Sequence, residues 1–477
     1  MDKKKTTKTA RQKSISYCAD TLLQLTHHGY DEESNETIFI KIFLEMPINN
    51  SYDTLANELS IKKNYWLPAV EIVGLNLMVW SYHRYLSEEK WADISWETIK
   101  NNFKHGFQWD ADGYLTNQFW HPFHGANYYS SARSNGLDFW ESVPYAFGGS
   151  LMWEFFMETE PPSYNDIVNT PVTGIILGEI SFCVSNLIID ESTGGFERVI
   201  REVSSTIINP MQGFNRMIRG DMWKSGISKI KADFNAEFSL GMHNVFFDNK
   251  INRRKSYLML RLNMNYGNQY DVDANKKPFD YFSLHTEFDL SSDDNITVIF
   301  ASGVLWDNHL DLFENSKNIF GIYKEIDIII NAVYKLSATS ITGQIINTVP
   351  LSSKVSLENF LGISTILMGA TNSQYASEYG KDYNIGPGAS AKVGMNLSFR
   401  DVGNIHINYK RYWIHTLSGA KSEEFVGLLN TGVSFNLSKN IEIGFDALLY
   451  ERYGVYKLFP DTQSSNTAVR IFIKHNI

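Results

Sequence analysis

The chain has 477 residues, with 43 Lys and Arg against 53 Asp and Glu, so its formal net charge is −10. This acidity argues against a nucleic-acid binder, and a mean hydropathy of −0.25 excludes a membrane protein built from many apolar helices. Aromatic residues make up 14% of the chain, which favours β-structure with rings at membrane interfaces.

Residues 1–60 are predicted to form a flexible polar arm. The first thirteen residues include six bases, but the apolar segment of roughly 7–15 residues that a secretion signal needs does not follow them. No signal peptide is therefore visible, and we expect the natural chain to start upstream with one. The two cysteines, Cys18 and Cys183, predict neither a disulfide framework nor a cysteine-based zinc site.

Residues 61–225 are predicted to form a helical domain. Its first helix, at 66–85, is nearly long enough to span a membrane, but Glu71, Asn76 and His83 interrupt its apolar pattern. Further helices are expected at 95–105, 118–134, 139–158, 165–190, 195–206 and 210–222.

Several of these helices carry boundary signals. Ser95 and Ser163 precede helical patterns as N-caps, and Asn209 stands before a proline at the first helical position. Gly136 is expected to end the helix that contains Arg133. Gly174 and Gly178 form a small-x-x-x-small step that predicts a close helix contact.

Residues 226–477 are predicted to form an antiparallel β-barrel, because the apolar pattern changes to a period of two. Phe234, Ala236 and Phe238 alternate with Asn235 and Glu237, and the chain repeats this pattern to its end. Longer loops are expected at 306–318 and 371–388, and a bulge at Lys410-Arg411. Strands are expected at 229–246, 256–267, 280–291, 295–305, 319–331, 333–349, 353–370, 389–400, 403–417, 422–437, 440–453 and 465–477.

Alternation alone leaves two kinds of β-structure open: a membrane barrel with its apolar face outward, and a soluble sandwich or lipocalin-like barrel with that face inward. The charges on the polar face favour the membrane barrel, since they can pair across a wet lumen. The predicted fold class is therefore α+β, with an N-terminal helical domain followed by an antiparallel transmembrane β-barrel of about 12 strands. Rings at the strand ends are interpreted as interfacial girdles, namely Phe246, Tyr266, Trp306, Tyr412, Trp413 and Tyr450.

The densest group of polar and aromatic residues lies between Asn117 and Glu179. It contains Asn117-Gln118-Phe119-Trp120-His121-Pro122-Phe123-His124-Gly125, Tyr128-Tyr129, Ala132-Arg133, Trp153-Glu154-x-x-x-Glu158, Asn165-Asp166-Ile167 and Gly174-x-x-x-Gly178-Glu179. With the following barrel, this stretch resembles an uncharacterised family of Bacteroidota-type outer-membrane proteins, the domain of unknown function 3943, over residues 66–477. The resemblance implies an outer-membrane location and supplies no activity.

Three residues of this group are candidates for catalysis: His121, His124 and Glu154. The two histidines stand three residues apart and can share a helix face. A buried carboxylate beside an imidazole can act as general acid or base, and two histidines with a carboxylate can hold a metal. The alternative is a hydrogen-bonded network that fixes the register of packed helices, and the frequency with which buried polar groups are simply satisfied favours this alternative.

The same group supplies a candidate polar network for binding or packing. Arg133 is expected to pair with Glu141, Glu154 or Asp166, and Asp166 is expected at a helix N-terminus. No nucleophile elbow, H-E-x-x-H motif, P-loop or dinucleotide fingerprint occurs in the chain, so no cofactor and no metal are predicted. The network comprises Tyr128, Arg133, Ser150, Glu158, Asp166 and Glu179.

The leading functional prediction is an outer-membrane β-barrel with a periplasmic or lumen-plugging helical domain, acting in envelope transport, assembly or structure. The alternative is an outer-membrane hydrolase or acyltransferase that modifies lipids with the His/Glu site, and a narrow pore for a small solute is a third. The expected partner is outer-membrane lipid, with a small solute or an envelope protein left open and nucleic acid excluded.

Overall fold

In this computed structural model, the described residues are 62–109, 112–226, 232–250, 252–271, 276–290, 296–312, 315–331 and 333–477. All of the described residues belong to one compact unit. The predicted arm at 1–60 and the start of the first predicted strand, at 229–231, lie outside the described residues.

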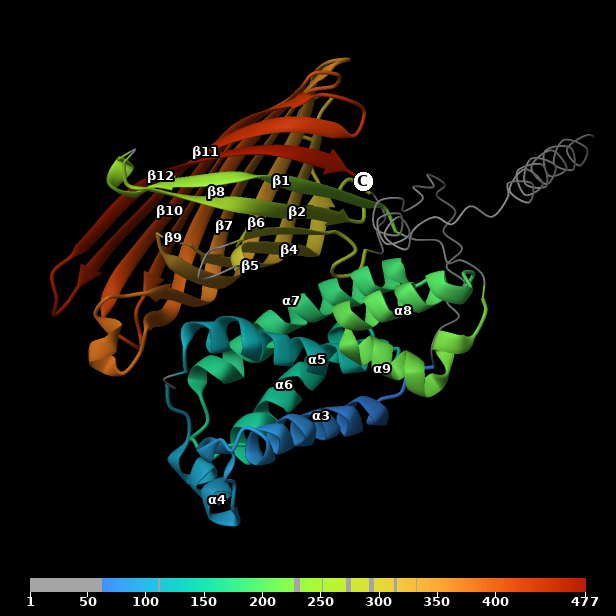
Figure 1. Cartoon of the computed structure of the whole chain (residues 1–477), viewed down its shortest axis with the longest axis vertical. Coiled ribbons are helices and arrows are strands. Elements are labelled where there is room, and N and C mark those ends of the chain that lie inside the picture. The colour runs from blue at the N-terminus through green and yellow to red at the C-terminus, as the bar shows by residue number, and fades with distance from the viewer. Residues whose placement is uncertain are drawn as a thin grey trace, which may run out of the picture. The chain divides into compact units, whose positions relative to one another are not determined.

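The helical part has the elements that the sequence predicts, with boundaries that differ by a few residues (Figure 1). A π-helical turn, Thr116–Trp120, leads directly into α5. The helices of the described chain are α3 (Trp66–Tyr85), α4 (Trp96–His105), α5 (His121–Ser134), α6 (Phe139–Phe156), α7 (Tyr164–Ile188), α8 (Gly195–Ile208) and α9 (Pro210–Arg219).

The predicted boundary signals act as hydrogen-bonding caps. The Ser95 side chain accepts from the Thr98 backbone N–H, and the Ser163 side chain accepts from the Asp166 backbone N–H. Asn209 caps α9 in the same way, with a proline at the first helical position. Gly136 follows α5 with a φ of 84°, a left-handed conformation that glycine adopts without strain.

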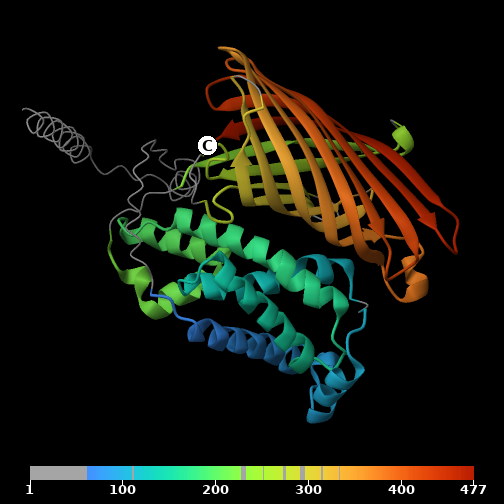
Figure 2. The ribbon, with the colours of Figure 1, turned by 180° about the vertical axis from the view of Figure 1, so that it is seen from behind.

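The β part is a closed antiparallel barrel, in which the first strand pairs with the last (Figures 1 and 2). Closure leaves no unpaired strand edge. A barrel wall in lipid must be closed in this way, because no water is present there to bond to free backbone groups. This confirms the predicted fold class. The twelve strands of the described chain are β1 (Phe234–Phe246), β2 (Arg254–Tyr266), β3 (Phe282–Leu290), β4 (Ile296–His309), β5 (Lys317–Ile330), β6 (Lys335–Ser352), β7 (Val355–Asn372), β8 (Tyr383–Phe399), β9 (Gly403–His415), β10 (Ser422–Asn436), β11 (Ile441–Tyr456) and β12 (Thr462–Asn476).

The barrel wall is apolar outside and polar inside. On β1, Phe238, Leu240 and Met242 are 42 to 48% exposed, whereas Ser239 and His243 on the opposite face are fully buried. Charged side chains are buried in the interior and apolar side chains face outward, which is the reverse of a soluble barrel. The wall therefore has the pattern of a membrane-spanning barrel.

Side chains from strands that are not neighbours meet inside the lumen. Lys410 on β9 donates to Asp327 on β5 over 2.9 Å, and Arg261 on β2 pairs with Asp446 on β11 over 2.7 Å. The hydroxyl of Tyr334, before β6, donates to the carbonyl oxygen of Gly427 on β10 at 3.4 Å. These contacts fill the lumen with the protein's own side chains.

Two details of the strands differ from the sequence-based expectations. Tyr412 and Tyr450 are 1% exposed and belong to a buried lumen cluster, so their assignment to an interfacial girdle was wrong. No register shift occurs at Lys410-Arg411; Lys410 faces the lumen and Arg411 pairs outside with Glu451, so the predicted bulge was wrong.

The predicted loops at 306–318 and 371–388 are shorter than expected, because strands extend into both. Gly386 and Gly388 lie inside β8. A Cβ atom at either glycine would lie 1.9 Å from a backbone oxygen of the neighbouring strand β9, so the close approach of the two backbones explains these glycines.

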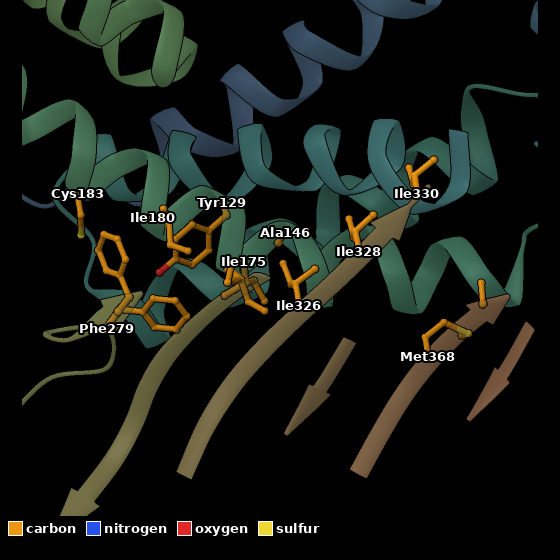
Figure 3. Packing of buried hydrophobic residues seen from close by; sticks show 14 of the residues in the cluster. Tyr129, Ala146, Ile175, Ile180, Cys183, Phe279, Ile326, Ile328, Ile330 and Met368 are labelled. Carbon is orange, nitrogen blue, oxygen red and sulfur yellow. The ribbon is translucent and has the colours of Figure 1, made fainter. Parts of the chain in front are cut away.

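The helical domain packs against the outward face of the barrel wall. Ile326, Ile328 and Ile330 of β5 point toward the helices, on the face opposite to the lumen residues Glu325 and Asp327 (Figure 3). The helices also cover polar groups of the wall: Thr173 and Thr339 share a hydrogen bond of 2.6 Å, and Gln118 accepts from Ser337 at 2.7 Å. These described contacts lie on the outer face and not in the lumen.

Close packing of α5 on α7 holds the helical domain together. A Cβ atom at Gly174 would lie 2.5 Å from the backbone of Gly125, and one at Gly178 would lie 2.8 Å from the ring of Tyr129. The predicted small-x-x-x-small step is therefore confirmed, and its partner is α5. This crossing fixes the position of the polar residues on α5.

Candidate functional site

A groove of about 1670 Å³ runs along α3 between α5 and α9. Leu67 and His83 both line it and are sixteen positions apart on α3, so it extends about 24 Å along the helix axis. Its volume is larger than the range of about 300–1,000 Å³ for most small-molecule sites. The walls along α3 and α9 are mainly apolar, with Leu67, Val70, Leu75, Met78, Met211, Phe214 and Ile218.

The end of the groove near His83 is polar and contains both candidate histidines. His121 is the first residue of α5 and follows the π-helical turn, an irregularity that often marks functional sites. Its Nε2 atom lies 3.4 Å from Oδ2 of Asp112 and 3.9 Å from Oδ1 of Asp166. Burial by itself lowers the pKa of His121, but the carboxylates of Asp166, Asp112 and Glu154 outweigh it and raise the pKa to about 10. His121 is therefore charged at neutral pH.

His124 lies one helical turn further along and has the opposite electrostatic setting. Its ring stacks on Tyr128 at a centroid distance of 5.4 Å and lies 5.3 Å from the ring of Trp153. Burial, and then the charges of His121 and His83, lower the pKa of His124 to about 4. The groove thus ends at one charged and one neutral imidazole.

The remaining polar residues of this end connect α6 to the N-terminus of α7. Glu154 is 2% exposed and accepts a 2.7 Å hydrogen bond from the Ser163 backbone N–H. Ser150 donates to the Asp166 backbone oxygen at 3.3 Å. Asp166 occupies the first turn of α7, as the sequence predicts. Glu158 lines the groove, whereas Glu154 is not among its lining residues.

The structure places Arg133 and Glu179 in a separate cluster at the other end of α5. Arg133 donates to both carboxylate oxygens of Glu179, at 2.6 and 2.9 Å, and Tyr129 donates to the same carboxylate at 2.7 Å. The expected pairing of Arg133 with Glu141, Glu154 or Asp166 was therefore wrong. The reason is that α5 presents Arg133 to the apolar stretch of α7, where a lone carboxylate needs a partner.

The candidate residues are thus divided between two places. The groove's polar end brings together His121, His124, Glu154, Glu158, Ser150 and Asp166, with Tyr128 stacked on His124. Arg133 and Glu179 lie away from it and form a bidentate ion pair that packs helices together.

Sequence reasoning missed the part of the site that α3 contributes. His83 lines the polar end of the groove, and its ring lies 4.9 Å from that of Trp91. Asn76 accepts from the hydroxyl of Tyr128, which supports the ring under His124. The signal was present, because these polar side chains interrupt the apolar pattern of α3, but the sequence does not place α3 beside α5.

Glu71, the third interrupting residue of α3, holds a buried hydrogen-bond network. Its carboxylate accepts from the side chains of Ser131, Asn135 and Asn215, which joins α3 to α5 and α9. These contacts fix the apolar walls of the groove relative to one another.

Two further properties of the described residues concern metal binding and membrane-spanning helices. Among them, no group of three or more His, Cys, Asp or Glu side chains could hold a metal ion. One described helix, Tyr164–Ile188, is long and apolar enough to cross a membrane, with a mean hydropathy of 1.6, but 56% of that window is buried inside the protein. This degree of burial is typical of a core helix.

The family model described as a domain of unknown function, DUF3943, matches residues 106–211, which include α5 to α8 and most of the polar end of the groove. No curated protein matches the chain.

Among solved structures, the chain is similar to OmpT, an outer membrane protein of Vibrio cholerae, with 8% identity, 51% of this chain and 97% of that chain covered, and a TM-score of 0.25. The NanC porin has 8% identity, coverages of 50% and 98%, and a TM-score of 0.29. An outer membrane channel of Pseudomonas putida F1 has 6% identity, coverages of 52% and 97%, and a TM-score of 0.28.

Proposed function

We propose that this protein binds lipid in the outer membrane: the barrel anchors it, and the groove of the helical domain holds the apolar chain of an amphiphile. The observation that carries this proposal is the groove itself. It is about 1670 Å³ in volume, has apolar walls and ends in ionisable side chains. Its length of about 24 Å exceeds the half-thickness of about 15 Å of a bilayer's hydrocarbon core, so one lipid chain fits along it.

The position of the helical domain supports lipid as the ligand. The helices pack on outward-facing residues of the barrel wall, where lipid would otherwise lie. Apolar side chains of the helical domain are also exposed, in a stripe along α8 that consists of Phe196, Val199, Val203 and Ile207. Exposed apolar patches of this kind mark membrane or partner surfaces.

The filled lumen supports an anchoring role for the barrel. Because Lys410, Asp327, Tyr334 and Gly427 make contacts across the lumen, an open pore would need these contacts to break. The proposal therefore places the envelope role in the helical groove, as lipid transport or assembly. The outer-membrane location and the Bacteroidota-type origin that the resemblance implies remain part of this proposal.

The proposal can be tested with a variant whose larger side chain occupies the groove. Gly74 lines it on α3, and a Cβ atom there meets no heavy atom within 4 Å. Gly148 on α6 is equally open but does not line the groove. Both are exposed helical glycines, so Gly74→Trp and Gly148→Trp form a matched pair. We expect native mass spectrometry of detergent-extracted protein to find bound lipid in the wild type and in Gly148→Trp, and a strong loss in Gly74→Trp. Equal lipid in both variants would contradict the proposal.

A second candidate function is modification of the bound lipid, by hydrolysis or acyl transfer. The observation that favours it is the contrast between the charged His121 and the neutral His124 at the end of the groove, since environments that separate two pKa values often assign acid and base roles. His124→Ala and Glu154→Ala should then abolish a lipid change while the barrel still assembles. A lipid profile that is unchanged in both variants would exclude this candidate.

A further inference from the structure

The outer face of α3 is apolar, and the polar residues of this helix lie inside the helical domain. Glu71 and Asn76 are buried, where they bond to Asn135 and Tyr128. They lower the hydropathy of α3 as a whole without reaching its outer face. From Trp66 to Met78 each exposed residue lacks a polar side chain; the set is Trp66, Ala69, Val70, Val73, Gly74, Leu77 and Met78. Helices at a water-exposed surface have the opposite arrangement.

The helices α8 and α9 show the same inversion. Arg198 and Glu202 of α8 pair at 2.9 Å, and Arg216 of α9 pairs with Glu202 at 2.8 Å, although each of these residues is at most 8% exposed. Apolar residues of the two helices are 41 to 74% exposed, namely Phe196, Val199, Val203, Ile207, Phe214, Met217 and Ile218. Charges that pair inside a bundle, with apolar side chains outside, are typical of helices in lipid.

We propose that lipid covers this outer face, so that the helical domain is embedded in the hydrocarbon of the outer membrane beside the barrel and α3 crosses it. The polar end of the groove, at His83, then lies at the level of the lipid headgroups. This location differs from the periplasmic or lumen-plugging one that the sequence predicts. It depends on the membrane barrel but not on a lipid bound in the groove.

The length and the ends of α3 fit a bilayer. Its 20 residues extend about 30 Å, which is the thickness of the hydrocarbon core. Tyr65 and Trp66 are exposed at the start of the helix, and Tyr82 and Tyr85 are exposed at its end. Tyrosine and tryptophan are enriched at the two interfaces of a membrane. The rings of α3 therefore stand about one hydrocarbon thickness apart.

The attachment of the domain to the barrel indicates lipid as the covering. The helices pack on the outward wall at Ile326, Ile328 and Ile330, a surface that lipid would otherwise cover (Figure 3). Figures 1 and 2 show α7 next to the barrel and α3 on the far side of the helical domain. A domain that replaces lipid on this wall meets lipid with its own outer surface.

The test measures the environment of spin labels on the full chain in phospholipid vesicles. Single cysteines are introduced after Cys18 and Cys183 are replaced by serine. Power saturation then compares collisions of the label with oxygen, which concentrates in hydrocarbon, and with a water-soluble nickel chelate. Slower migration of each boiled variant on a gel verifies that its barrel was folded.

Four positions form a matched set. Val73→Cys on α3 and Val203→Cys on α8 probe the outer face. Leu240→Cys is the lipid reference, because Leu240 is 48% exposed on the outward face of β1. Lys100→Cys is the water reference, because Lys100 is exposed on α4 beside the charged Lys104. We expect the oxygen-to-nickel collision ratio of both probes to match that of Leu240→Cys and to exceed that of Lys100→Cys several-fold.

The remaining outcomes would overturn the inference. A ratio at Val73 and Val203 like that at Lys100 would place the outer face in water. Few collisions with either reagent would mean that a protein partner or a second copy covers it. A ratio no higher at Val73 than at Trp66→Cys and Tyr85→Cys would contradict the crossing of the hydrocarbon by α3. Each of these results leaves lipid binding in the groove to its own test.

Discussion

At the scale of single residues, the two histidines of the groove have opposite effects on stability as the pH changes. The folded state lowers the pKa of His124 to about 4, so between pH 6.5 and 4 the unfolded chain binds the proton more strongly. The stability contributed by neutral His124 is therefore present above pH 6.5 and is lost as the pH falls toward 4. We predict that His124→Gln loses less stability than the wild type between pH 6.5 and 4. Thermal unfolding in detergent at a series of pH values measures this difference.

His121 provides the control for this prediction. Its pKa is raised to about 10, so the stability from its charged form is present below pH 6.5 and is lost as the pH rises through 10. His121→Gln should flatten the alkaline side of the profile, and it should also weaken the pH dependence on the acid side, because the charge of His121 helps to lower the pKa of His124. His124→Gln should change the acid side alone, and a change on its alkaline side would contradict these assignments.

The ion pair between Arg133 and Glu179 gives a second prediction at this scale. Glu179 has a side chain that is 3% exposed, and Arg133 donates to both of its oxygens. Arg133→Met leaves a buried carboxylate without its cation, and we predict a loss of about 3 kcal/mol in the free energy of unfolding.

A double variant checks the cause of that loss. Arg133→Met combined with Glu179→Leu removes both charges and should recover most of the stability, because the cost comes from the unpaired charge. Denaturant titration monitored by tryptophan fluorescence measures both values. A double variant that is no more stable than Arg133→Met would show that the pair acts through packing.

At the scale of elements, the lumen side chains determine whether the barrel conducts. Tyr334, just before β6, and Tyr450 on β11 are buried, and their rings meet edge to face with centroids 5.8 Å apart. We predict that the wild type gives no steady single-channel conductance in a planar bilayer, whereas the double variant Tyr334→Ala and Tyr450→Ala opens a measurable one. Tyr453→Ala on the outer face of β11 is the matched control. Conductance in the wild type would contradict the filled lumen.

The elements themselves were largely predictable from the sequence, because periodicity and caps are local signals. Alternation identified each strand of the barrel, and Ser95, Ser163 and Asn209 marked helix starts. The predicted positions of the strand ends were less accurate. Gly386 and Gly388 indicate a loop by composition, but they lie in β8 because neighbouring backbones approach there.

The candidate site was only partly predictable, because its residues meet through tertiary packing. The sequence identified His121 and His124, yet it gave no means of placing α3 beside them, and so His83 and Trp91 were missed. Arg133 was assigned the wrong partner for the same reason: several carboxylates lie at suitable distances in sequence, and only the crossing of α5 with α7 selects Glu179.

At the scale of the whole molecule, a closed barrel with an apolar outer face should stay folded in detergent until it is boiled. We predict that the protein is recovered in the outer-membrane fraction and that unboiled protein migrates faster on a gel than boiled protein, since a closed barrel resists unfolding by detergent. Protein in the soluble fraction without a band shift would mean that the apolar faces do not meet lipid.

The central claim is that the helical domain docks on the outward wall of the barrel, so that its groove lies beside lipid. Thr173 of α7 and Thr339 of β6 have hydroxyl oxygens 2.6 Å apart on this wall, whereas Thr342 of β6 faces the lumen and bonds to Glu325. Disulfide geometry requires Cβ atoms about 4 Å apart, so only the first pair is within reach.

The most direct measurement is therefore cysteine cross-linking in native membranes, in a chain whose Cys18 and Cys183 are replaced by serine. Thr173→Cys with Thr339→Cys should form a disulfide that mass spectrometry detects between the two peptides, and Thr173→Cys with Thr342→Cys should not. A cross-link to position 342, or none to position 339 in folded protein, would contradict docking on the outer wall.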